Sequence, residues 1–149
     1  MTLTAYFTQA KSALNLPPTT VFQSAYQFGV EASTLANLVL TGVKTATTSA
    51  YDLYEPNEAL PQVGAYDVIL DAHDQPVCVT QTDQVTVVPY REVGSQHAFN
   101  EGEGDRSLAY WRQVHAAFFE QEYRDNQQVF DPQTAQMVLE KFHVVYPQR

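Results

Sequence analysis

Residues 31–49 read EASTLANLVLTGVKTATTS, and this stretch contains a helix, its end and the start of a strand. Leu35, Leu38 and Val39 fall on one face of a helix. Gly42 stands where a helix commonly ends in a left-handed residue. Residues 45–49 are small or β-branched, which favours a strand. We therefore expect a helix that ends at Gly42 and a strand that begins just after Lys44.

Further elements are predicted on both sides of this stretch. An amphipathic helix is expected over residues 3–14, before two prolines, and the longest helix over residues 106–124. Short apolar runs predict four more strands, at residues 66–70, 77–82, 85–88 and 137–146. Closely spaced short strands favour a small barrel or sandwich over a parallel sheet. With no repeat or linker, we expect one α+β domain.

The charge distribution draws attention to Lys44. The chain carries 8 Lys and Arg residues against 17 Asp and Glu, a formal net charge of -9. Between residues 12 and 90 the only cation is Lys44, among eight acids. Binding duplex DNA requires neutralising several phosphates, so duplex DNA is excluded as a partner. A lone cation in an acidic region indicates a pairing or catalytic role.

The composition also indicates the cellular compartment of the protein. A single cysteine, Cys78, cannot form an internal disulfide, which fits a reducing compartment. The first residues lack a basic region followed by a long apolar run, so no signal peptide is expected. No apolar stretch is long enough to span a membrane. We therefore expect a cytoplasmic protein with no membrane partner.

The segment Glu101-Gly-Glu103-Gly-Asp105 places three carboxylates within five residues. One interpretation is an acidic start of the long helix, stabilised by the helix dipole. The alternative is a carboxylate held in a tight glycine turn, as a general base or a partner of Lys44. Like charges this close are expected to raise at least one pKa if they are desolvated.

The remaining candidate residues give weaker signals. The hydroxyls after Lys44 could include a nucleophile, but strand alternation separates Lys44 from Thr47 unless a turn intervenes. His97 and the nearby carboxylates match no recognised ligand spacing, so no metal site is expected. No dinucleotide or phosphate-loop motif is present, and no cofactor is expected. Trp111 and His115 are expected to pack against the core.

Two motifs together resemble the ASCH domain family. They are the Gly-x-Lys-x-Ala-Thr signature at residues 42–47 and the Glu-Gly-Glu-Gly-Asp-Arg-Ser-Leu block at residues 101–108. The resemblance is to the single-domain bacterial type and implies a PUA-like fold, a small and mostly antiparallel β-barrel with flanking helices. It further implies a single domain over residues 1–149, with an N-terminal helix and extension over 1–30 and the core over 31–146.

The resemblance also implies functions. Relatives have RNA-related roles, and one similar protein is an amidohydrolase that deacylates N(4)-acetylcytidine with a Lys, a Thr and a Glu. These correspond to Lys44, Thr47 and either Glu101 or Glu103. Two departures stand out, since many relatives have Gly-Asp where this chain has Gly64-Ala65, and an acid where it has Gln81. Cleft or metal functions that used those acids would be weakened here.

Three functional hypotheses follow. As a hydrolase, the chain would use Lys44 and a glutamate to activate Thr47 or water, with Arg106 or backbone N–H groups holding the oxyanion. As a non-catalytic module, it would bind RNA or a modified nucleoside by stacking and by phosphate contacts from Lys44 and Arg106. As a metal-dependent ribonuclease, it would need a cation. The expected ligand-binding residues are Thr48, Ser49, Tyr51, Tyr54 and Arg106.

Overall fold

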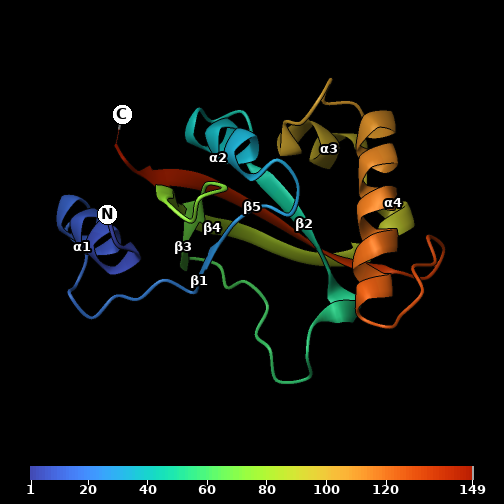
Figure 1. Ribbon diagram of the computed structural model, residues 1–149, viewed down its shortest axis with the longest axis horizontal. Coiled ribbons are helices and arrows are strands. Elements are labelled where there is room, and N and C mark those ends of the chain that lie inside the picture. The colour runs from blue at the N-terminus through green and yellow to red at the C-terminus, as the bar shows by residue number, and fades with distance from the viewer. Residues whose placement is uncertain (149) are drawn as a thin grey trace.

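The computed structural model describes residues 1–148 and confirms an α+β fold (Figure 1). Its α-helices are α1 (Leu3–Ala13), α2 (Ala32–Leu40), α3 (Ser95–Glu101) and α4 (Leu108–Asp125). Its strands are β1 (Ser24–Tyr26), β2 (Ala46–Ala50), β3 (Tyr66–Leu70), β4 (Pro76–Pro89) and β5 (Gln136–Tyr146). The predicted helix end at Gly42 is confirmed, with a φ of 83° at that residue.

The five strands form one sheet in the order β1-β3-β4-β5-β2. All neighbouring pairs are antiparallel except β1 with β3. The sheet curls into an open half-barrel, so the expectation of a mostly antiparallel PUA-like barrel with flanking helices is confirmed. In Figure 1, α2 and α3 lie along one side of the sheet, α4 lies across one end and α1 lies near the other.

Two details of the expected strands are wrong. Residues 77–82 and 85–88 belong to one strand, β4, which pairs with β5 along both halves. A register shift between Thr82 and Gln84 inserts Asp83 as an extra residue, so the polar break in the sequence is a β-bulge and not a turn. Strand β1, with only three residues, was not predicted.

The start of the long helix also differs. Helix α4 begins at Leu108, where the Ser107 hydroxyl accepts a hydrogen bond from the backbone N–H of Tyr110. Glu101 instead ends the seven-residue helix α3, which was not predicted. The dipole of a helix disfavours an anion at its C-terminus, so the interpretation of Glu101 as a dipole-stabilised N-terminal acid is wrong.

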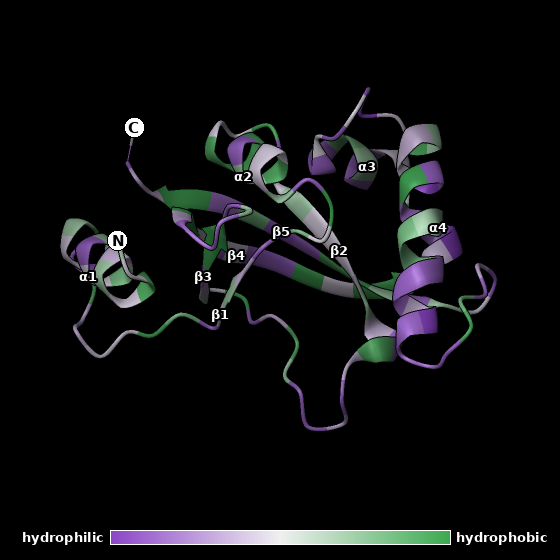
Figure 2. Cartoon of the chain, in the orientation of Figure 1, coloured by the Kyte–Doolittle hydropathy of each residue, from purple (hydrophilic) through white to green (hydrophobic). Residues whose placement is uncertain are grey.

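Each of three helices packs an apolar face on a different part of the sheet. Helix α1 covers Val68 and Val79, and α2 covers Ile69, Cys78 and Phe142. Helix α4 carries Trp111, Phe119 and Tyr123 into the largest core cluster, whereas the other residues of its last turns are mostly hydrophilic (Figure 2). Helix α4 is therefore packed against the core along its length, and its N-terminal part lies beside the candidate site.

Candidate functional site

Lys44 is fixed in place by the end of α2. The backbone N–H groups of Val43 and Lys44 both donate to the carbonyl of Leu38, at 2.9 and 3.0 Å. Because β2 begins only at Ala46, the Lys44 side chain leaves from a turn and is not bound to strand alternation. Its side chain is 1 % exposed and its Nζ lies over the ring of Phe28, 5.1 Å from the centroid.

The two glycines of the acidic block bring its carboxylates to Lys44. Gly102 has a φ of 73°, and a Cβ there would overlap the backbone of Val43. Gly104 has a φ of 59°, and a Cβ there would overlap the ring of Tyr110. Only glycine therefore allows the loop after α3 to touch the turn before β2 and the first turn of α4.

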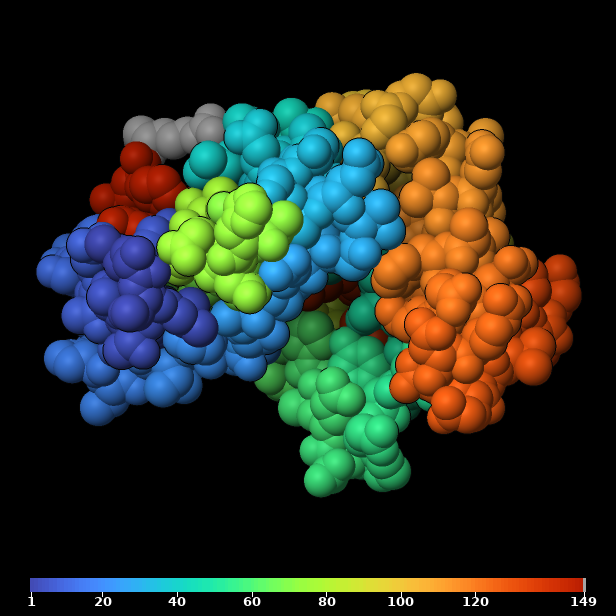
Figure 3. Space-filling model, viewed as in Figure 1, coloured from blue at the N-terminus to red at the C-terminus, as the bar shows by residue number. Residues whose placement is uncertain are grey.

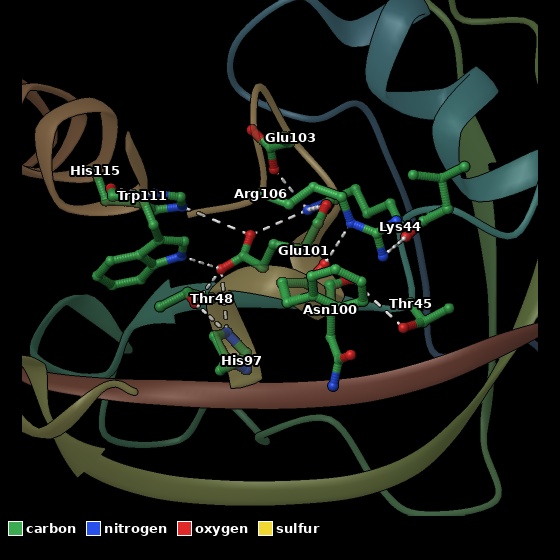
Figure 4. Close-up of polar contacts among 12 residues, drawn as sticks. Lys44, Thr45, Thr48, His97, Asn100, Glu101, Glu103, Arg106, Trp111 and His115 are labelled. Carbon is green, nitrogen blue, oxygen red and sulfur yellow. Dashed lines mark hydrogen bonds and ion pairs between the residues drawn. The ribbon is translucent and has the colours of Figure 1, made fainter. Parts of the chain in front are cut away.

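Lys44 lies between two carboxylates (Figure 4). Its Nζ is 3.0 Å from Oε1 of Glu101 and 2.7 Å from Oε2 of Glu103. The side chain of Glu101 is 2 % exposed and that of Glu103 is 16 % exposed. The three groups sum to one negative charge, and Glu103 is the carboxylate that faces solvent.

The other contacts of Glu101 hold it rigidly. Its Oε2 accepts hydrogen bonds from the Thr48 hydroxyl and the Trp111 indole N–H, each at 2.6 Å, and lies 3.1 Å from Nε2 of His97. Its Oε1 lies 3.6 Å from Nε2 of His115. Burial alone would raise the pKa of Glu101, but the Lys44 ammonium and the two histidines outweigh it and hold the pKa well below its usual range. The expectation of a raised pKa in this block is wrong for Glu101.

Trp111, His97 and His115 extend this site into the core. Trp111 packs in the main core cluster, as expected, and its indole also binds Glu101. His115 stacks on Trp111 at 4.2 Å and its Nδ1 contacts the Trp111 carbonyl. His97 also lies 2.8 Å from the Thr48 hydroxyl. Sequence reasoning missed the roles of His97 and Trp111, although His97 precedes Glu101 by one helical turn.

The candidate hydroxyl groups differ in whether they are hydrogen-bonded within the protein. Thr48 is engaged with Glu101 and His97, and Ser49 lies 2.9 Å from the Tyr54 hydroxyl. Thr47 lines the cleft, and its hydroxyl makes no hydrogen bond within residues 1–148. Of the hydroxyl groups that line the same chamber as Lys44, that of Thr47 is therefore the one left free to contact a ligand.

Two of the candidate residues are not brought into the cleft. The Arg106 guanidinium stacks on Phe99 at 3.7 Å and donates to the backbone carbonyls of Phe99 and Val43, at 3.0 and 3.4 Å. It thereby ties α3 to the turn that carries Lys44. Tyr51 is 44 % exposed and lines neither chamber of the cleft described below.

A cleft of two chambers opens over these residues. The inner chamber, of about 100 Å³, is lined by Lys44, Glu101 and Glu103. The outer chamber, of about 570 Å³, lies within the size range of small-molecule sites. Both chambers share the side chains of Phe28, Thr47, Thr48 and Phe118. In Figure 3 the hollow lies where the blue, green and orange segments meet.

A second pair of acids lies in the outer chamber and was not predicted. Asp67 and Glu140 are 3 % and 5 % exposed. Burial and the charge of Glu140 raise the pKa of Asp67 to about 7. Burial also raises the pKa of Glu140, against a hydrogen bond from Thr82. At this end of the cleft the Asp67 carboxyl therefore exchanges its proton near neutral pH, whereas Glu101 at the Lys44 end is held ionised.

Asp67→Asn is expected to stabilise the protein at pH 8. The folded pKa of Asp67 lies above its unfolded value, so its contribution to stability is complete below about pH 4 and is lost as pH rises to about 7. The gain at pH 8 should be on the order of 4 kcal/mol, because the pKa rises from 3.8 to about 7 and each pKa unit corresponds to about 1.4 kcal/mol. Urea unfolding at pH 4 and pH 8 measures it, and an equal effect at both values would contradict the assignment.

Two further properties concern residues 1–148. In this part of the chain, no group of three or more His, Cys, Asp or Glu side chains is arranged to hold a metal ion. None of its helices combines the length and apolar character needed to cross a membrane.

The chain is similar to known proteins both in sequence and in structure. The sequence profile of the ASCH domain matches residues 24–146. The crystal structure of an ASCH domain from Lactobacillus crispatus is similar, with a TM-score of 0.87 and 31 % identity over 96 % of this chain and 93 % of that one. Protein EF3133 from Enterococcus faecalis is similar with a TM-score of 0.85 and 31 % identity, over 99 % and 95 %. No protein with a curated function shows significant similarity to this chain.

Proposed function

This chain belongs to the ASCH domain family, and from that premise we propose that its cleft binds a modified nucleoside and hydrolyses an amide on it. The observation that carries the proposal is the position of Lys44, buried between two carboxylates at the inner end of a cleft. Perturbed ionisable groups that converge in a cleft are typical of catalytic sites. The unengaged Thr47 hydroxyl beside them supplies a candidate nucleophile.

The two glutamates take different roles in this proposal. Glu101 is buried and contacts Lys44, Thr48, Trp111 and both histidines, so it serves as a fixed charge that positions them. Glu103 is partly exposed, and its carboxylate contacts only Lys44 within residues 1–148. Glu103 is therefore the carboxylate that can exchange protons with a ligand.

In the proposed hydrolysis, Lys44 and Glu103 transfer the protons. The oxygen of Thr47 or of a water molecule bonds to the amide carbon and passes its proton to Glu103, while the Lys44 ammonium stabilises the developing oxyanion. The carbon–nitrogen bond breaks, and the leaving nitrogen takes a proton from Lys44. Lys44 regains a proton from Glu103 over their 2.7 Å contact. If Thr47 attacks, water then hydrolyses the acyl-threonine ester.

Release of acetate from N(4)-acetylcytidine tests this function. We expect turnover by the wild type and a fall in kcat of at least about 100-fold in both Lys44→Ala and Glu103→Gln, because each removes a proton-transfer group. Glu120→Gln makes the same amide change at an exposed position of α4 and should keep wild-type activity. The proposal fails if the wild type releases no acetate from this or related acylated nucleosides, or if Lys44→Ala matches it.

A second candidate function is binding without catalysis. It is favoured by the aromatic side chains of Phe28, Tyr54 and Phe118 in the cleft, which offer surfaces for a base. Because Lys44 is paired and Arg106 is engaged with backbone, the affinity for single-stranded RNA should depend little on salt. A steep salt dependence would show phosphate contacts and contradict this expectation. RNA cleavage that is abolished by chelators would instead indicate that the protein is a metal-dependent ribonuclease.

A further inference from the structure

The outer chamber contains a connected set of polar groups that the proposed chemistry does not use. Gln23 Nε2 lies 3.2 Å from Oδ2 of Asp67 and 3.1 Å from the hydroxyl oxygen of Thr82. The Thr82 hydroxyl in turn donates to Oε2 of Glu140, at 2.7 Å. The two carboxyl groups are thus held by one network that spans β3, β4 and β5.

This network leaves one hydrogen-bond acceptor unsatisfied. Oδ1 of Asp67 is buried and has no hydrogen-bond partner among residues 1–148, although Asp67 lines the chamber and is only 3 % exposed. An unsatisfied buried oxygen of this kind costs free energy that a donor on a ligand would recover. Above about pH 7, where the Asp67 carboxyl is ionised, the position therefore favours a ligand group that carries O–H or N–H donors.

The charge of the chamber limits which ligands fit. Its lining includes the acids Glu58, Asp67, Glu122 and Glu140, and none of the described residues that line it is a lysine or arginine. A phosphate adds about -1.5 to -2 charges and is normally bound by cationic or backbone N–H donors. The outer chamber thus disfavours a phosphate and suits an uncharged group.

The acidic pair also lies close to the proposed chemistry. Thr47 in β2 is directly opposite Glu140 in β5. Residues paired in this way have Cβ atoms about 4.5–5.5 Å apart. Both side chains line the outer chamber, so a ligand whose reactive group reaches Thr47 and Lys44 places its neighbouring atoms beside Glu140.

We propose that the Asp67–Glu140 pair is a second recognition subsite, which accepts hydrogen bonds from an uncharged donor-rich group, such as the hydroxyls of a ribose, and excludes phosphorylated ligands. The inference rests on the proposed function because it takes the ligand to be a nucleoside. It makes the free nucleoside, and not the nucleotide or an RNA strand, the substrate class. Asp67 and Glu140 then determine specificity, separately from Lys44 and Glu103.

Calorimetric titration at low ionic strength tests the subsite, with cytidine, 2′-deoxycytidine, cytosine and cytidine 5′-monophosphate as probes. The wild type should bind cytidine at least about tenfold more tightly than the monophosphate, and this ratio should fall at least threefold in Asp67→Asn and in Glu140→Gln. Weaker binding of 2′-deoxycytidine would identify ribose hydroxyls as the donors, whereas full affinity for cytosine would identify base N–H groups. Glu120→Gln is the matched control and should keep the wild-type ratio.

The two experiments distinguish failure of the Asp67–Glu140 subsite from failure of the proposed hydrolase activity. If the wild type binds the nucleoside and monophosphate equally, fails to bind cytidine, or keeps its preference in both variants, the subsite is rejected, even where N(4)-acetylcytidine is hydrolysed. If the preference depends on Asp67 and Glu140 while no acylated nucleoside is hydrolysed, the subsite stands and the hydrolase is rejected. Unfolding temperatures of the variants confirm that each compared protein is folded.

Discussion

Lys44→Met is expected to destabilise the protein by about 3–5 kcal/mol, the usual cost of removing one partner from a buried ion pair. The methionine fills a similar volume, so the loss comes from leaving Glu101 and Glu103 without their cation. Urea unfolding at pH 7 measures the difference. Lys141→Met, which makes the same change at an exposed position of β5, should cost less than about 0.5 kcal/mol.

The pH dependence of this variant gives a second readout. In the wild type the pKa of Glu101 is lowered, so its contribution to stability is complete above the unfolded pKa and is lost as pH falls through the folded one. In Lys44→Met the largest influence that lowers this pKa is gone, so the pKa of Glu101 is expected to rise and the variant is expected to lose stability as pH rises through it. The difference in free energy of unfolding between Lys44→Met and the wild type should therefore become smaller from pH 7 to pH 5. A difference that stays constant would contradict an ionised Glu101.

Glu101→Gln is expected to cost a similar amount, about 3–5 kcal/mol, although the two side chains have nearly the same shape. An amide brings two N–H donors to a place where Thr48, Trp111 and Lys44 already donate. At least one donor is then left facing another donor, and Lys44 loses its buried counter-charge. Urea unfolding measures the loss, with Glu120→Gln as the exposed control.

The double variant Lys44→Met/Glu101→Gln checks whether the two effects share one cause. Residues joined in a buried ion pair are coupled, so the double variant should lose less stability than the sum of the single losses, by at least about 1.5 kcal/mol. Additive losses would show that the two side chains stabilise the fold independently. That result would remove the ion pair as the organising element of the site.

The sequence was most informative where local chemistry decides the structure. The helix end at Gly42, the strand after Lys44 and the closing strand over 137–146 follow from capping, β-branching and alternation, and the structure contains them. It was misleading at Asp83, because a bulge and a turn both interrupt an apolar pattern with polar residues. Helix α3 has seven residues and ends in a buried acid, so its pattern is too short to detect.

The candidate site, too, could be predicted from the sequence only in part. The isolation of Lys44 and the proximity of Glu101 and Glu103 to one another are visible in the sequence. Their contacts with Lys44 depend on Gly102 lying against Val43, which is a tertiary contact. Asp67 and Glu140 were missed because each occupies an ordinary position in a strand pattern. They come into one chamber because β3 and β5 pair with the two edges of β4, which is a tertiary arrangement.

The loop between β2 and β3 extends beyond the sheet (Figure 1), and residues 58–62 of it form one wall of the outer chamber. None of the side chains that contact Lys44 or Glu101 comes from this loop. Exchanging the loop for one of another length would reshape the wall without touching the ion pair. In engineering terms the protein is modular, since one wall of the outer chamber can be redesigned on a loop while the Lys44–Glu101 ion pair stays at the ends of α2 and α3.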